Sequence, residues 1–64
     1  MRAPALARVE YEIERVAREL VEQYGSDAPA YVRERAEQAE AIGDQISAQE
    51  WRAIAEAAEG MLRS

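Results

Sequence analysis

Two glycines, Gly25 and Gly43, divide the chain into three segments in which apolar residues recur at every third or fourth position. This spacing gathers the apolar side chains of each segment on one face of an α-helix, and it differs from the alternation of a strand. Glycine ends a helix readily because it adopts the left-handed conformation without a side-chain penalty. The pattern therefore predicts a single all-α domain over residues 1–64, with three helices in an up-down-up arrangement. The expected helices cover about 4–24, 28–42 and 47–62.

The first expected helix has the longest apolar stripe of the three. Its members lie three or four residues apart: Leu6, Val9, Ile13, Val16 and Leu20. Pro4 is compatible with the first turn, since the amide that proline lacks would have no helical partner there. A helix of about 20 residues is about 30 Å long, whereas the other two helices are nearer to about 15 residues. We therefore expect the N-terminal end of the first helix to project past the other two.

The second expected helix is rich in small residues. Either Ser26 or Asp27 can cap its free amides, and Pro29 lies in its first turn. Its apolar stripe is narrow and lets a neighbouring backbone approach closely: Val32, Ala36, Ala39 and Ile42. We expect other helices to pack against this stripe, and we expect the helix to end at Gly43.

The segment from Ile46 to Trp51 has the pattern of a helix start and contains the only tryptophan of the chain. With Ser47 as the N-cap, Glu50 lies three residues further on, as in the reciprocal capping box. Ile46 would then precede the cap and Trp51 would occupy the fourth helical position, which is the pairing of a hydrophobic staple. We interpret Trp51 as a structural clamp, and the alternative is that it belongs to a recognition site.

Large apolar side chains are scarce in this chain. Hydrophobic residues make up 48% of the sequence, but 14 of the 64 residues are alanines. A domain of this size gains little stability beyond the conformational entropy that it loses on folding. We therefore expect a small acidic protein-interaction module without catalytic activity. It would work as a homo-oligomer, most simply a dimer, or as an adaptor for another protein.

The contact residues predicted from the sequence lie near the N-terminus. Leu6, Val9 and Ile13 form the end of the stripe that should project, and an exposed apolar stripe requires cover. Tyr11 lies off this stripe, where it is either an amphipathic surface residue or a further contact.

Composition argues against several other classes of function. The chain carries 8 basic and 13 acidic residues, and its net charge of −5 opposes binding to a phosphate backbone. It lacks histidine and cysteine, which excludes imidazole and thiolate chemistry. It also lacks an apolar run of signal-peptide or membrane-spanning length. We expect a cytoplasmic protein with no cofactor or metal, which does not act as an enzyme and binds neither nucleic acid nor membrane.

Glu34, Glu37 and Glu40 recur at every third position of the second expected helix. A cation site needs several oxygen ligands that converge in a cavity. This spacing is more typical of an ordinary acidic helix surface.

A DNA-associated regulator is the alternative function. The second and third expected helices, joined by the turn Gly43-Asp44-Gln45-Ile46, resemble a helix-turn-helix. The exposed positions of the candidate reading helix would carry as many acids as bases: Gln49, Arg52, Glu56, Glu59 and Arg63. Glu50 would lie at the end where base contacts are expected.

A series of helix-ending, capping and packing residues extends over most of the chain. Its members are Ala17, Leu20, Tyr24, Gly25, Asp27, Ala28, Arg35, Ala36, Ala39, Gly43, Asp44, Trp51 and Ile54. In this pattern the chain resembles small uncharacterised helical proteins of alphaproteobacteria, a domain-of-unknown-function family. The resemblance covers roughly residues 17–62 and leaves the segment from Met1 to Val16 outside. It implies no reaction, cofactor or ligand.

Overall fold

The computed structural model describes the backbone of residues 5–64 and, from residue 11 onward, their side chains. The elements are helix α1 (Ala5–Tyr24), a short 3-10 helix η1 (Gly25–Asp27), helix α2 (Ala28–Ala41) and helix α3 (Gln45–Arg63). No strand occurs among residues 5–64, which confirms the all-α prediction.

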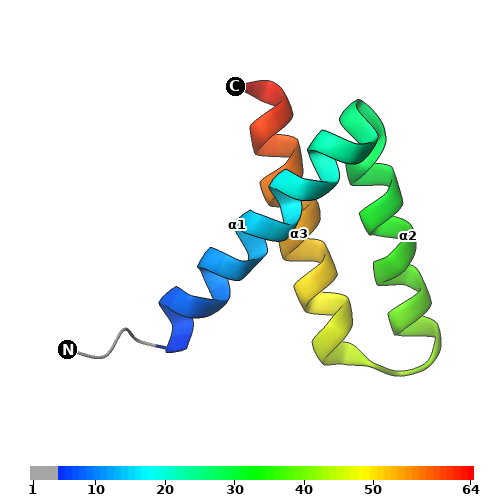
Figure 1. Cartoon of the computed structure of the whole chain (residues 1–64). Coiled ribbons are helices and arrows are strands. Elements are labelled where there is room, and N and C mark those ends of the chain that lie inside the picture. The colour runs from blue at the N-terminus through cyan, green and yellow to red at the C-terminus, as the bar shows by residue number, and fades with distance from the viewer. Residues whose placement is uncertain (1–4) are drawn as a thin grey trace.

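The helices form a flat arrangement in which α2 and α3 are antiparallel neighbours and α1 lies across α3 (Figure 1). Helix α1 packs mainly on α3 and contacts α2 much less. Its N-terminal half extends away from the α2–α3 pair, as expected (Figure 1). The expected reason is wrong, however, because α3 has 19 residues and is nearly as long as α1 with 20. The N-terminal half projects because α1 crosses α3. The molecule measures 38 × 32 × 16 Å. Two packed layers of helices have a Cα thickness of about 14 Å. The smallest dimension of 16 Å is close to this value, so α1 forms a second layer on one face of the α2–α3 pair and leaves the other face open to solvent.

Both glycines that separate the expected helices adopt the left-handed conformation, with φ of 60° at Gly25 and 80° at Gly43. Helix α1 ends at Tyr24, directly before the first of them, as predicted. Asp27 holds the N-cap position of α2, but its side chain makes no capping hydrogen bond. Its φ of −84° and ψ of −6° continue the helical conformation of η1, whereas a capping side chain usually requires an extended backbone. Pro29 lies in the first turn of α2, as expected.

The end of α2 is closed by two backbone hydrogen bonds around Gly43. The Gly43 amide donates to the Glu40 carbonyl oxygen at 3.0 Å, and the Asp44 amide donates to the Ala39 carbonyl oxygen at 2.8 Å. This pair of bonds is the Schellman motif, which requires a left-handed residue at the position of Gly43. Asp44 is therefore the last residue whose backbone takes part in the motif that ends α2.

The same Asp44 begins α3, and the prediction that Ser47 is the N-cap is wrong. The Asp44 carboxylate accepts a hydrogen bond from the Ser47 backbone amide at 3.1 Å. Its carbonyl oxygen accepts the Ala48 amide at 3.1 Å, which is the first bond of the helical ladder. Aspartate caps a helix as well as serine does, and its charge is favourable at a helix N-terminus. Because Asp44 already closes α2, α3 starts two residues earlier than expected.

This earlier start also rules out the capping box and the hydrophobic staple. Ile46 lies in the first turn of α3 with 72% of its surface exposed, so it does not clamp Trp51. Glu50 is exposed in the second turn and has no cap to reciprocate. Trp51 is half-buried and packs directly against the core. The tryptophan therefore has a packing role, although not the one that we predicted.

The capping interaction also acts on the acidity of Asp44. Hydrogen bonds from the Ser47 hydroxyl, and next from the Ser47 backbone amide, stabilise the carboxylate and lower the pKa of Asp44 below its usual value of 3.8.

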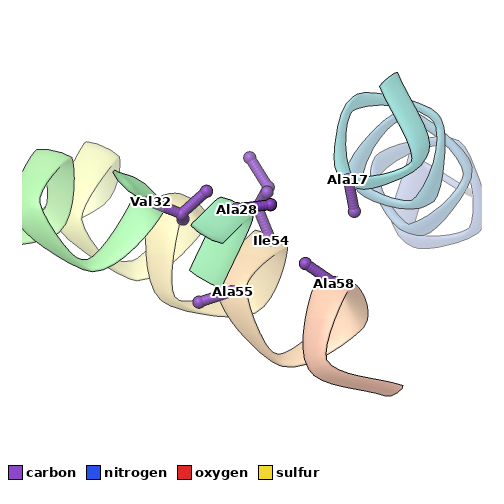
Figure 2. Close-up of a cluster of buried hydrophobic side chains, with 6 residues drawn as sticks. All are labelled: Ala17, Ala28, Val32, Ile54, Ala55 and Ala58. Carbon is purple, nitrogen blue, oxygen red and sulfur yellow. The ribbon is translucent and has the colours of Figure 1, made fainter. Parts of the chain in front are cut away.

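The core consists almost entirely of alanine. Its buried members are Ala17, Ala28, Val32, Ala36, Ala39, Ala48, Ile54, Ala55 and Ala58. Figure 2 shows the central cluster, in which Ala17 of α1 points toward Ala58 of α3. Val32 is the largest side chain that is completely buried. Larger apolar residues pack around this cluster and remain partly exposed: Ile13, Val16, Leu20, Val21, Tyr31, Trp51 and Met61.

Candidate functional site

The contact between α1 and α3 contains a hollow with an apolar floor. Ile13 and Val16 of α1 and Ile54 of α3 line the hollow, which has a volume of about 150 Å³. Ile54 is buried, whereas Ile13 and Val16 are half-buried. The α1 residues lie three apart and therefore share one face of the helix. The apolar stripe of α1 thus packs on α3 but stays partly exposed to solvent.

Two glutamates form the polar rim of this hollow. Glu12 comes from α1 and Glu50 from α3, and both are exposed. A second, wider hollow also involves Ile13 and contains Glu14 and Glu56. Among the described side chains, no arginine lines either hollow. The surface around the α1–α3 contact therefore combines apolar area with negative charge.

The contact between α2 and α3 has a different character, since two glutamates there are paired with arginines. Arg33 of α2 forms an ion pair with Glu59 of α3, and Arg52 of α3 forms one with Glu40 of α2. These side chains are from 35% to 55% exposed, and ion pairs at such exposure contribute little to stability. A shallow groove of about 420 Å³ runs along this face. Its charges are largely compensated from within the molecule.

A group of aromatic residues lies at the corner between α1 and α2. The rings of Tyr24 and Tyr31 stack with their centroids 4.6 Å apart and an interplanar angle of 18°. The Arg35 guanidinium donates a hydrogen bond to the Tyr31 hydroxyl at 3.1 Å and lies 5.2 Å from the centre of the same ring. Stacking and cation–π contact hold the corner together, which gives these residues a structural role.

The structure separates the residues that the sequence predicted as contacts. Ile13 packs against the core and lines the hollow. Tyr11 is 68% exposed, and residues two positions apart on a helix point about 200° away from each other. Tyr11 and Ile13 therefore belong to opposite faces of α1. The side chains of Leu6 and Val9 lie outside the described residues.

Several residues of the hollow did not stand out in the sequence as contact residues. Val16 belonged to the expected stripe, but only the packing of α1 on α3 shows that it stays half-exposed. The sequence pattern predicts Glu50 as part of a capping box, whereas the structure has it on the rim of the hollow. The sequence feature that could have indicated this site is the glutamate on each side of Ile13, at positions 12 and 14. These two residues place negative charge along the edges of the apolar stripe.

Neither a metal site nor a membrane-spanning helix is found in the described part of the chain. Histidine, cysteine, aspartate and glutamate residues form no group of three or more that is arranged to hold a metal ion there. Among the described helices, none combines the length and the apolar character needed to cross a membrane.

Comparisons with protein-family models, with curated proteins and with solved structures found no match to this chain. The family resemblance over residues 17–62 therefore stays a prediction from the sequence.

Proposed function

We propose that this chain is a small acidic protein-interaction module of the cytoplasm, without catalytic activity, that associates with copies of itself or serves as an adaptor for another protein. The observation that supports the proposal is that the larger apolar side chains around the core are only partly buried. Among the side chains described from residue 11 onward, Val32 is the largest that is completely buried, whereas Ile13, Trp51 and Met61 stay partly exposed. Covering such side chains with a second protein surface removes apolar area from water at about 25 cal/mol per Å².

The arrangement of α1 adds to this argument. A long helix that rests on one partner helix leaves much of its length without cover, and Figure 1 shows its N-terminal half beyond the α2–α3 pair. By sequence, that half continues the apolar stripe through Leu6 and Val9. A second copy of the chain is the simplest source of cover, because symmetric dimers are the commonest assemblies of soluble proteins.

Analytical ultracentrifugation over a range of micromolar concentrations tests the self-association. We expect the wild-type chain to shift from monomer to dimer as its concentration rises. The double substitution Leu6→Glu with Val9→Glu should keep the chain monomeric, because it places two charges on the stripe. The control, Arg15→Gln with Arg18→Gln, changes the net charge by the same amount at exposed positions of α1 and should leave the dimer intact. A folded monomer at every concentration, with both variants unchanged, would rule out the homo-oligomer.

The structure adds no support to the DNA-associated alternative. The two arginines between α2 and α3, Arg33 and Arg52, are each paired with a glutamate, and phosphate binding relies on available cations. A duplex-binding assay at about 50 mM salt, where phosphate contacts are strong, should show no salt-dependent complex.

A further inference from the structure

The glutamates around the α1–α3 contact, both at this hollow and at the wider one beside it, form no ion pair with an arginine whose side chain is described. On the α2–α3 side, Glu40 and Glu59 each have an arginine partner. The rim glutamates Glu12 and Glu50 border a hollow that no described arginine lines. A partner surface that brings cations to this rim would therefore meet carboxylates that no arginine pairs with among the side chains described from residue 11 onward.

The size of the hollow limits what can enter it. Its volume of about 150 Å³ matches that of an engineered protein cavity, also of about 150 Å³, which binds benzene. One large aliphatic or aromatic side chain therefore fits between Ile13, Val16 and Ile54. The exposed rim leaves room for the backbone that carries this side chain.

We propose that the hollow between α1 and α3 binds a basic amphipathic helix of a partner protein, whose apolar anchor enters the hollow while its lysines or arginines pair with Glu12 and Glu50. An amphipathic helix presents apolar anchors and charged flanks on adjacent faces, which is the pattern that this surface complements. The inference rests on the proposed function as an interaction module and specifies the chemistry of the partner.

A second copy of this chain is a poor occupant of the same hollow. Its net charge is −5, and its own stripe is bordered by glutamates on both sides of Ile13. Docking that stripe would bring carboxylates against Glu12 and Glu50, and like charges in an interface disfavour association. Self-association through the N-terminal half of α1 does not require the hollow.

The test measures binding of the full chain to a synthetic helical peptide with leucines on one face and lysines on the other. The peptide carries a fluorescent label, and its fluorescence anisotropy rises when it binds the chain. A second peptide, in which glutamate replaces every lysine, is the control for apolar binding alone. We expect the basic peptide to bind and the acidic peptide to bind at least tenfold more weakly. Equal affinity for the two peptides, or no binding of the basic peptide, would overturn the inference.

Two matched pairs of substitutions distinguish the effect of the rim glutamates on peptide affinity from the effect of the net charge of the chain. Glu12→Gln with Glu50→Gln removes two rim charges, and exposed ion pairs of about 0.2–1 kcal/mol each correspond to an affinity loss of roughly 2- to 30-fold. Glu22→Gln with Glu34→Gln removes two exposed charges outside the hollow and should leave the affinity within about twofold. If both pairs weaken binding equally, the peptide responds only to net charge and the inference fails.

The apolar floor is tested by Val16→Phe, which should fill the hollow and abolish binding of the basic peptide. Because this variant can also perturb the fold, amide chemical shifts of the wild-type chain supply an independent readout. Peptide binding should shift the amides of residues 12–16 and 50–54, and shifts confined to the paired face around Arg33 and Arg52 would contradict the proposal.

These outcomes are distinct from those of the proposed function. A chain that self-associates but ignores the basic peptide would remove the partner assignment and leave the interaction module standing. A chain that stays monomeric and binds neither peptide would remove both.

Discussion

The same substitution, glycine to alanine, should have opposite effects at two positions of this chain. An added Cβ meets nothing within 4 Å at either Gly60 or Gly43, so packing does not distinguish them. Gly60 lies inside α3, where alanine stabilises a helix by about 0.5–1 kcal/mol relative to glycine. Gly43 has a φ of 80°, and the left-handed conformation costs residues with a Cβ about 1–2 kcal/mol. The two variants should therefore differ by about 1.5–3 kcal/mol in the free energy of unfolding.

Urea denaturation followed by far-UV circular dichroism measures this difference directly. All samples need the same protein concentration, since any association would shift the apparent stability. For a domain of this size a change of 1 kcal/mol shifts the melting temperature by about 4–8 °C. Gly60→Ala should thus melt about 2–8 °C above the wild-type chain, and Gly43→Ala about 4–16 °C below it. A shift of both variants in the same direction would refute this expectation, because the expectation rests on the left-handed backbone of Gly43 and the helical backbone of Gly60.

Three other predictions concern the cap, the core and the tryptophan. Because the pKa of Asp44 is lowered in the fold, Asp44 stabilises the protein above about pH 3.8 and loses this effect as the pH falls toward the folded-state pKa. Ser47→Ala removes the hydroxyl donor, so NMR titration should find the pKa of Asp44 closer to 3.8, and an unchanged value would contradict the assigned cause. Val32→Ala should lower the free energy of unfolding by about 2 kcal/mol, from about 1.6 kcal/mol of lost transfer energy and the cavity left behind. Ile42, which is 80% exposed, should tolerate the same change within about 0.5 kcal/mol, and comparable losses in urea titrations of the two variants would contradict the core assignment. Because Trp51 is half-buried, Trp51→Ala should lower the free energy of unfolding by roughly half of the about 3–5 kcal/mol expected for a fully buried tryptophan. A loss of peptide binding at unchanged stability would instead identify Trp51 as a recognition residue.

The start of α3 shows why local pattern alone was insufficient. Two overlapping signals compete there, since Asp44 lies three residues before Ser47 and Ser47 lies three residues before Glu50. Each pair fits a helix N-terminus, and only one can form. The bond from the Asp44 amide to the Ala39 carbonyl oxygen decides between them, because it belongs to the end of the preceding helix. The sequence pattern that predicted the staple contained no information about that bond.

The candidate site was predictable only in part for a related reason. The stripe containing Ile13 and Val16 is visible in the sequence, and so are the glutamates beside it. Which part of the stripe rests on α3, and which side chains of α3 meet it, depends on how the helices cross. Tyr11 illustrates the limit, since helical spacing already placed it off the stripe of Ile13, but only the structure shows that its side chain is 68% exposed.

Local sequence is sufficient to predict that this chain is helical and that its helices end before Gly25 and Gly43, because apolar spacing and left-handed glycines act within a few residues of each other. The way in which α1 lies across α3, and with it the hollow between Glu12 and Glu50, arises only when the helices pack together. Alanine-rich stripes pack closely but offer few large side chains to fix a unique crossing or to fill the space between helices. The position of α1, and with it the candidate site, therefore depends on contacts between residues far apart in the chain.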